Sequence, residues 1–317
     1  MPTDRPLRLG TRGSQLARWQ SQWVAERLRS CGHSVELVEV RTLGDARQSG
    51  PISEIVDSSG AIAGGQGVFT KELQRALLAG QVDLAVHSLK DLPTAPVEGL
   101  TLAAAPERAP VADVLVSPTA TRISDLSNGA RVGTGSFRRK AQLLNRRPDL
   151  RVSDLRGNLD TRLAKLDRGE HDAILLAEAG LARLGWSDRL AGRIPPHELL
   201  PAPGQGALGV ECRADDSRTL AALALLEHWP TRAAVTAERS ALARLEGGCL
   251  AALGAWGRFE GDSLRLSVVV LSDDGVKRLD AELADLCPDA RAARDIGHRV
   301  ADELLSRGAG DLLRSRG

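Results

Sequence analysis

Aromatic side chains are scarce in this sequence: its 317 residues include five Trp, three Phe and no Tyr. The core must therefore be built from Leu, Val, Ala and Ile, and a platform of stacked rings that binds single-stranded nucleic acid is not expected. The charges nearly cancel, with 42 basic and 41 acidic side chains. No overall field therefore draws nucleic acid or an anionic membrane to the chain, and any anion site must come from local placement of Arg and Lys.

Long apolar runs are also missing. No run approaches the roughly 18 apolar residues that a membrane-spanning helix needs. The opening stretch, MPTDRPLRLGTRGS, has no apolar segment of the kind found in secretion signals. We therefore expect a soluble cytoplasmic protein that does not enter a membrane.

Cysteine occurs only at positions 31, 212, 249 and 287, with no C-x-x-C pair and no histidine at metal-ligand spacing. A zinc site is therefore not expected, and a reducing compartment disfavours disulfides. Cys249 follows two glycines in RLEGGCLAALG, which give the backbone freedom and access. The residues alone leave open whether this thiol is buried and inert or reactive.

Short apolar strands alternate with amphipathic helices over most of the first two thirds of the chain. This alternation is typical of α/β layers with mostly parallel strands. The remaining third indicates a helix, two strands joined by Asp-Asp-Gly, and a closing helix, which together predict a small α+β domain. The expected domains are an α/β lobe of residues 1–106, completed by residues 207–224, a second α/β lobe of residues 111–200, and an α+β domain of residues 229–317.

Two similar turns, GTRGS and GTGS, each stand between a predicted strand and a predicted helix. Free backbone N–H groups and hydroxyls at a helix N-terminus form a natural anion site. Arg12 lies inside the first turn, and Arg138 and Arg139 begin the helix after the second. Cations at a helix N-terminus oppose the macrodipole, so stability alone does not favour them there. Neither turn is a Walker A loop or a full G-x-G-x-x-G, so a nucleotide is not indicated.

Seven cations follow predicted strands, at the edge where open α/β sheets bind ligands. Any one of them could be an ordinary surface residue, but the whole set favours a polyanionic ligand, because the arginine fork pairs with carboxylate or phosphate. The seven are Arg12, Lys90, Arg138, Arg139, Arg156, Arg162 and Arg183.

Asp91 is the one carboxylate in the HSLKD turn that carries Lys90. It could be a turn residue or an ion-pair partner of Lys90. Alternatively, it stabilises positive charge on a bound substrate or acts as an acid or base. The residues alone do not decide between these roles.

Six segments are informative in their order: GTRGSQLARWQ, VHSLKDLPT, GTGSFRRKAQL, LRGNLDTRLAKLDRGEHDAILLAEAGLARLG, LPAPGQGALGVECR and ERSALARLEGGC. Together they resemble the porphobilinogen deaminases (hydroxymethylbilane synthases) of tetrapyrrole biosynthesis, from Leu7 to the C-terminal helix. The resemblance implies two lobes like those of type II periplasmic binding proteins, with mixed, mostly parallel sheets, and a third, α+β domain.

The same resemblance implies a monomeric transferase. It joins four porphobilinogen molecules head to tail, releases ammonia at each step, and then releases hydroxymethylbilane by hydrolysis. The implied cofactor is a dipyrromethane primer held by a thioether to Cys249, without a metal.

The motifs also imply roles residue by residue. Asp91 is the expected catalytic carboxylate, facing the pyrrole nitrogens. Each porphobilinogen carries an acetate and a propionate, which accounts for the arginines in a chain without net basic charge. The expected carboxylate-binding residues are Arg12, Ser14, Ser88, Lys90, Thr134, Ser136, Arg138, Arg139, Arg156, Arg162 and Arg183.

The sequence departs from the family pattern in a few places. The segment before Val68 is longer than usual and has Ile62 and Gln66 where many members have lysines. Ala252 stands where proline is usual, and Glu178 replaces a small or apolar residue. These departures put in doubt an anion contact of the long segment and the surroundings of the cofactor.

Two other functions are compatible with a two-lobed chain. A non-catalytic binding protein for a small carboxylate is the main alternative, but a third domain with an accessible cysteine counts against it. A ligand-sensing regulator is the other, but no DNA-binding helix pair precedes the first predicted strand.

Overall fold

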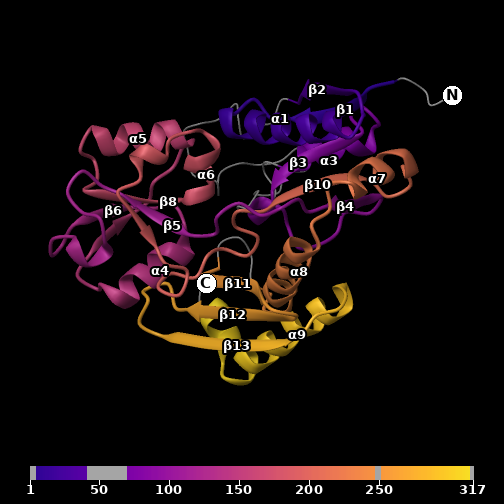
Figure 1. Ribbon diagram of the computed structural model, residues 1–317. Coiled ribbons are helices and arrows are strands. Elements are labelled where there is room, and N and C mark those ends of the chain that lie inside the picture. The colour runs from indigo at the N-terminus through magenta and orange to yellow at the C-terminus, as the bar shows by residue number, and fades with distance from the viewer. Residues whose placement is uncertain (1–4, 41–69, 247–250, 315–317) are drawn as a thin grey trace. The chain divides into compact units, whose positions relative to one another are not determined.

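The computed structural model describes residues 5–40, 70–246 and 251–314 (Figure 1). The chain divides into two compact units. The first comprises residues 1–108 and 207–232, and the second comprises residues 109–206 and 233–317.

The first unit contains a five-stranded sheet in the order β2-β1-β3-β10-β4. Four strands run in one direction and β10 runs against its neighbours β3 and β4. Helices α1 and α7 cover one face, and α3 covers the other. The strands are β1 (Leu7–Thr11), β2 (Val35–Glu39), β3 (Leu84–Ser88), β4 (Leu100–Ala104) and β10 (Leu208–Arg213), and the helices are α1 (Gln15–Ser30), α3 (Lys71–Leu78) and α7 (Ser217–Ala224).

Local sequence fixes the ends of α1. Ser14 is its N-cap, and the Ser14 hydroxyl accepts a hydrogen bond from the Ala17 N–H. At the other end Gly32 has a φ of 87°, which only glycine adopts readily and which ends the helix. The buried side of α1, which includes Val24 and Leu28, then packs on the sheet.

The second unit contains another five-stranded sheet, in the order β7-β6-β8-β5-β9. Here β5 is the strand that runs against its neighbours, β8 and β9. Helix α4 covers one face, and α5 and α6 cover the other. The elements are β5 (Asp113–Val116), β6 (Arg131–Gly133), α4 (Phe137–Arg146), β7 (Arg151–Ser153), α5 (Leu159–Asp167), β8 (Ala173–Ala177), α6 (Glu178–Arg183) and β9 (Gly192–Ile194).

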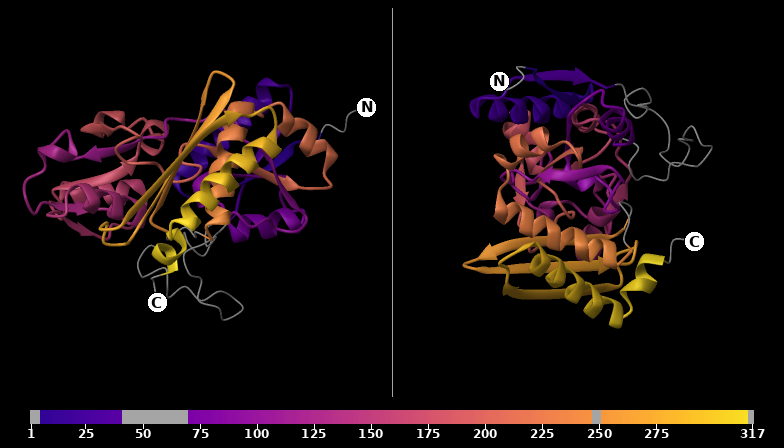
Figure 2. Two further views of the ribbon diagram at one scale, coloured as in Figure 1. Left: turned by 90° about the horizontal axis from the view of Figure 1, so that it is seen from below. Right: turned by 90° about the vertical axis from the view of Figure 1, so that its right-hand side faces the viewer.

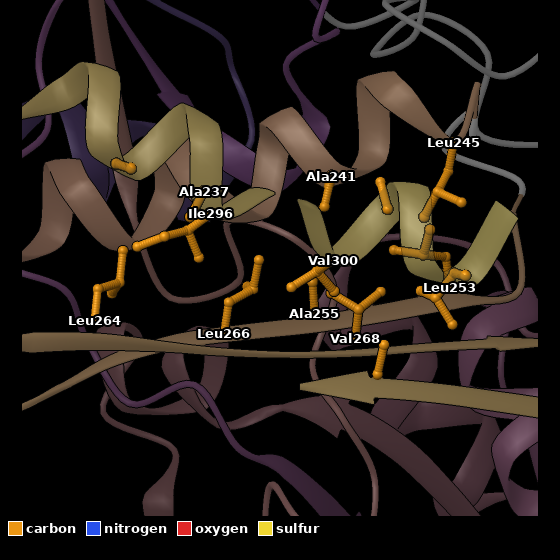
Figure 3. Packing of buried hydrophobic residues seen from close by; sticks show 14 of the residues in the cluster. Ala237, Ala241, Leu245, Leu253, Ala255, Leu264, Leu266, Val268, Ile296 and Val300 are labelled. Carbon is orange, nitrogen blue, oxygen red and sulfur yellow. The ribbon is translucent and has the colours of Figure 1, made fainter. Parts of the chain in front are cut away.

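The same unit holds an antiparallel sheet in the order β11-β12-β13. Its core side packs against α8 and α9, with Ala237, Leu266 and Ile296 among the buried residues (Figure 3). Figure 2 shows α9 lying along this sheet from two further directions. The elements are α8 (Trp229–Arg244), β11 (Leu253–Glu260), β12 (Ser263–Leu271), β13 (Arg278–Leu286), α9 (Ala290–Ser306) and α10 (Ala309–Arg314).

Both sheets of the second unit are joined by close contacts. Ala141 of α4 and Leu200 form a buried cluster with Ala252, Val269 and Leu271. The Ala255 N–H donates to the Pro201 carbonyl at 2.8 Å. Val269 and Leu271 belong to β12, and Ala255 belongs to β11, so the antiparallel sheet packs on the segment that follows β9.

The predicted fold class is confirmed: mixed, mostly parallel sheets with helices on both faces, followed by an α+β part. The pattern did not predict β4, β5, β9 or β11. The closing helix was expected as one piece but is two, because Gly308 has a φ of 89° between α9 and α10. Within the described residues, every helix is too short or too polar to cross a bilayer.

Candidate active site

Five predicted site residues gather at one edge of the first unit's sheet. β1 and β3 are parallel neighbours, with Gly10 paired to Ala85, so their carboxyl ends reach the same edge. The residues that end or follow these two strands are Arg12, Ser14, Ser88, Lys90 and Asp91.

Gln20 of α1 is a functional candidate that the sequence reasoning missed. Its side chain is buried, and its Nε2 donates to the Ser88 Oγ at 2.7 Å. This bond ties the end of β3 to the helix that Ser14 begins. A polar residue on the buried side of an amphipathic helix was the available signal, because such a group needs an internal hydrogen-bond acceptor or donor.

Asp91 lies in a short 3-10 turn, Leu89–Asp91, directly after β3. Leu89 anchors the turn: its side chain is fully buried, and its N–H donates to the Ala207 carbonyl at 3.0 Å. Asp91 itself is exposed. The turn therefore presents a solvent-accessible carboxylate from a fixed backbone.

A buried polar group lies next to this turn in the sequence. His87 Nε2 is 3.0 Å from a carboxylate oxygen of Glu211, and Gln74 Nε2 donates to both oxygens of that carboxylate. All three side chains are buried. They join β3, β10 and α3, so they hold the strand from which Lys90 and Asp91 continue.

The remaining predicted residues belong to the second unit. β7, β6 and β8 are parallel neighbours, and the turns after their carboxyl ends therefore share one edge. The predicted residues in those turns and in the helices that follow are Thr134, Ser136, Arg138, Arg139, Arg156, Arg162 and Arg183.

The GTGS turn is closed by its own hydroxyls. The Ser136 N–H donates to the Thr134 Oγ1 at 3.2 Å, and Ser136 caps α4 by accepting from the Arg139 N–H. A Cβ added to Gly135 would lie 2.8 Å from the Leu155 carbonyl oxygen. Glycine is therefore required there, because any side chain would push the turn away from the neighbouring strand end.

Arg138 and Arg139 both bind one acid, Asp113, at the start of β5. Arg138 Nη1 lies 2.6 Å from Asp113 Oδ2, and Arg139 Nη2 lies 2.7 Å from Asp113 Oδ1. All three side chains are buried. Asp113 is a residue that the sequence reasoning missed. A lone acid before an apolar strand, in VADVLV, was the available signal.

The charges in this cluster are strongly coupled. Burial alone would raise the pKa of Asp113, but the two guanidinium groups outweigh it and hold that pKa well below its usual range. Burial lowers the pKa of Arg138, against the attraction of Asp113. Asp113 is therefore ionised at every pH at which the protein would be assayed.

Arg183 is a second buried cation of this unit. Its Nη2 donates to the Gly206 carbonyl at 2.7 Å, and burial lowers its pKa to about 10. Arg162 is half-buried and donates from Nε to the Gly157 carbonyl at 2.8 Å. Arg156 is exposed and pairs with Asp154 at 2.5 Å.

Three consecutive residues, Gly204 to Gly206, contact different parts of this unit. The Gly204 N–H donates to Glu238 of α8 at 2.7 Å. Gln205 Nε2 donates to Asp113 Oδ1 at 2.9 Å, and the Gly206 carbonyl accepts from Arg183. Glu238, which is fully buried, also accepts from the Gly257 N–H in β11 at 2.7 Å.

Cys249 lies outside the described residues, as do Ile62 and Gln66. The elements on either side of Cys249 are described: α8 ends at Arg244 and β11 begins at Leu253. Glu238 is a residue of α8, and its carboxylate accepts from the Gly257 N–H in β11. This hydrogen bond links the two elements.

The other cysteines differ in accessibility. Cys212 is fully buried in β10, and burial raises the pKa of its thiol to about 11. Cys287 is also buried, which raises the pKa of its thiol. Cys31 is exposed at the C-terminal end of α1.

Two departures from the family pattern now have a local explanation. Ala252 is 2% exposed and packs in the cluster with Ala141 and Leu200, where a small apolar side chain fits. Glu178 is buried but paired, because Arg193 of β9 donates to its carboxylate from Nε at 2.8 Å.

The described residues contain no group of three or more His, Cys, Asp or Glu side chains that could hold a metal ion.

Comparison with known proteins assigns the family. The model described as porphobilinogen deaminase, dipyromethane cofactor binding domain, matches residues 7–221, and the model of the porphobilinogen deaminase C-terminal domain matches residues 232–306. The chain belongs to the porphobilinogen deaminase family.

Curated relatives agree over almost the whole length. The chain is 48% identical to the porphobilinogen deaminase of Desulforudis audaxviator over 311 residues, 98% of this chain and 97% of the relative. It is 46% identical to the porphobilinogen deaminase of Pelotomaculum thermopropionicum over 98% of this chain and 96% of that protein. Among solved structures, the methionine-binding protein MetQ gives a TM-score of 0.42, with 11% identity over 70% of this chain and 89% of its own.

Family membership confirms the resemblance seen in the sequence. The function is that of a porphobilinogen deaminase of tetrapyrrole biosynthesis with a dipyrromethane cofactor, and the chain is a transferase. A non-catalytic carboxylate-binding protein is not favoured.

Proposed function

We propose that the residues at the two sheet edges bind the carboxylates of porphobilinogen and of the growing chain, and that Cys249 holds the dipyrromethane by a thioether. The observation that carries this is the charge of the Asp113 cluster. Two buried guanidinium groups, those of Arg138 and Arg139, share the single buried carboxylate of Asp113, so the cluster has one net positive charge. Buried charges are costly unless they are paired, so this net charge supports an anionic ligand.

The residues present fit a cofactor of this kind. A dipyrromethane built from two porphobilinogen units carries four carboxylates, and the buried cluster has donors to meet them. Arg138 Nε is a buried N–H without a hydrogen-bond acceptor among the described residues. When bound, the dipyrromethane supplies the primer ring to which the first substrate is joined. Arg138, Arg139 and Arg183 are the residues that would hold it in this unit.

The positions of the other three cysteines support Cys249 as the attachment site. Burial leaves Cys212 and Cys287 as poor nucleophiles, because the thiolate is the reactive form. Cys31 lies at the end of α1 that is opposite to Ser14. A 16-residue helix is roughly 24 Å long, so Cys31 is remote from the sheet edge where the predicted site residues gather.

Asp91 is the proposed catalytic residue. When ammonia leaves porphobilinogen, the bond between the methylene carbon and nitrogen breaks, and the substrate is left as an electron-poor methylene-pyrrole cation. The fixed carboxylate of Asp91 would stabilise that positive charge, an effect typically worth several kcal/mol (about 3–4 for a single group). Lys90 and Arg12 at the same edge would hold substrate carboxylates and keep them from pairing with the cation.

The finer features of the proposal follow the family. The chain would carry out the complete hydroxymethylbilane synthase reaction, with four condensations and a final hydrolysis, as a cytoplasmic monomer. Its domains would be residues 1–106 with 207–224, residues 111–200, and residues 229–317. The three sheets support this division.

Intact-protein mass spectrometry tests the proposal directly. The freshly purified, active chain should be heavier than its sequence by two pyrrole units. Cys249→Ser should lose this added mass, while the control Cys31→Ser, which alters an exposed cysteine, should keep it. An active protein of unmodified mass would contradict the proposed mechanism.

A further inference from the structure

Asp113 is a fully buried carboxylate that carries two arginines. It begins β5, and its exposed fraction is 0%. Oδ2 accepts from Arg138 Nη1 at 2.6 Å, and Oδ1 accepts from Arg139 Nε at 3.1 Å and Nη2 at 2.7 Å. One acid therefore binds both arginines of the segment GTGSFRR.

Backbone carbonyls fix the same guanidinium groups from other directions. Arg138 Nη1 also donates to the Leu200 carbonyl at 2.8 Å, and Arg139 Nη1 donates to the Leu175 carbonyl at 3.0 Å. A guanidinium is planar and rigid, so two bonds at different nitrogens set the directions of its remaining N–H groups. Arg139 meets this condition fully, because its Nε and Nη2 donate to Asp113 Oδ1 and its Nη1 donates to the Leu175 carbonyl.

Gln205 extends the cluster toward the third buried arginine. Its Nε2 donates to Asp113 Oδ1 at 2.9 Å and to the Val111 carbonyl at 2.7 Å. The next residue, Gly206, accepts from Arg183 through its carbonyl. Asp113 is thus bonded to the segment that positions Arg183.

We propose that Asp113 is a positioning residue: it orients Arg138 and Arg139 toward the carboxylates of cofactor and substrate, and through Gln205 it links them to Arg183. Asp113 acts through the arginines and not on the reacting atoms. The inference rests on the proposed function, because the carboxylate-binding roles of the arginines are part of it.

A purely structural role makes a different prediction. A buried ion pair that only stabilised the fold would, when broken, reduce the fraction of folded protein. The folded molecules that remained would bind porphobilinogen with unchanged affinity. A positioning role instead changes KM among folded, cofactor-loaded molecules, because the arginines lose their orientation.

The test uses Asp113→Asn in the full-length chain. Asp172→Asn is the matched control, because Asp172 is also an acid paired with an arginine, Arg131, but it is half-exposed and precedes β8 at the opposite edge of the same sheet. Far-UV circular dichroism and thermal unfolding establish folding, intact mass establishes cofactor loading, and steady-state kinetics give KM and kcat.

Folded Asp113→Asn should either lack the two-pyrrole mass or show a KM raised by roughly tenfold or more, with a smaller change in kcat. Asp172→Asn should keep wild-type mass and KM. Asp113→Glu, which keeps the charge, should recover part of the affinity. A folded, loaded Asp113→Asn protein with wild-type KM would overturn the inference.

If Asp113→Asn does not fold, Gln205→Met tests the positioning role of Asp113. This substitution is neutral and leaves both ion pairs, but removes the amide that holds Asp113. It should raise KM by a few-fold, and a wild-type KM in the folded variant would overturn the inference. A wild-type chain with neither pyrrole mass nor turnover would instead refute the proposed function, before any Asp113 variant is compared.

Discussion

Asp113 and Ala177 are paired across the antiparallel strands β5 and β8. Ala177 is the last residue of β8 and Asp113 is the first residue of β5, so the start of one strand lies beside the end of the other. Asp113 therefore lies at the same edge of the sheet as the cations that follow the parallel strands. That acid is what allows Arg138 and Arg139 to be buried at the edge.

Thiol titration should distinguish the four cysteines. In the folded, cofactor-bearing protein one thiol, that of Cys31, should react with a disulfide reagent at pH 8. Cys212 and Cys287 should not react, because they are buried and burial raises their pKa values, to about 11 for Cys212. After unfolding, three thiols should react, because the fourth is consumed in the thioether.

Two results would contradict this assignment. Four reactive thiols in unfolded, active protein would show that no cysteine carries the cofactor. Cys31→Ser should abolish the reaction of the folded protein with the reagent. A thiol that still reacted rapidly in this variant would show that Cys212, Cys287 or Cys249 is accessible and unmodified.

Asp91→Asn should separate catalysis from stability. The side chain is exposed, so thermal unfolding should stay close to that of the wild type. The kcat should fall by about 100-fold or more, because the neutral amide cannot stabilise the positive charge left by departing ammonia. Asp215→Asn, which alters another exposed acid of the same unit, serves as the control and should leave kcat unchanged. Turnover near the wild-type rate in Asp91→Asn would rule out the assigned role.

Glu238→Ala should destabilise the chain. Its carboxylate accepts from the N–H groups of Gly204 and Gly257 inside the second unit. Each buried N–H left without an acceptor costs about 1–3 kcal/mol, so urea unfolding should show a loss of about 2–5 kcal/mol. Glu238→Gln should lose less. Glu303→Ala, an exposed acid paired with Arg307, should stay within about 0.5 kcal/mol of the wild type, and an equal loss in both alanine variants would contradict the buried role.

The sequence predicts most of the strand–helix units because their signals are local. Ser14 and Ser136 lie in turns that follow short apolar strands, and they cap α1 and α4, the helices that the pattern predicts. The strands that were missed are short or enter the sheet from a distant part of the chain. β5 is an example, because its four residues carry no alternating pattern and its place between β8 and β9 depends on long-range pairing.

The candidate site is also predictable only where its signals are local. Cations that follow parallel strands can be found from the strand pattern, as Arg12 and Arg183 were. Asp113, Gln205 and Glu238 could not be found in that way, because each acts on groups far from it in the sequence. Asp113 leaves one signal in the sequence, a lone acid before an apolar strand, but the partners of all three residues become visible only when the packing is known.

Arg183→Met should make the folded protein more stable and weaken its binding of substrate. Burial lowers the pKa of Arg183 to about 10, which corresponds to a cost of roughly 3 kcal/mol for keeping the charge inside the protein. Methionine fills a similar space without charge. The loss of the hydrogen bond to the Gly206 carbonyl reduces the gain in stability by about 1 kcal/mol. In the cofactor-free Cys249→Ser background, Arg183→Met should therefore raise the free energy of unfolding by about 1–2 kcal/mol.

The pH dependence has a defined sign. Because the folded pKa of Arg183, about 10, lies below the unfolded value, the unfolded state binds more protons in the window that begins near pH 10 and ends at the unfolded pKa. The parent protein therefore gains stability with rising pH in that window, and the advantage of Arg183→Met should shrink above about pH 10. With Cys249 restored, the same substitution should raise KM, because a carboxylate-binding cation is gone. Arg189→Met, which alters a more exposed arginine paired with Asp167, should change neither quantity. A less stable Arg183→Met protein with wild-type KM would show that this arginine serves the fold and not the ligand.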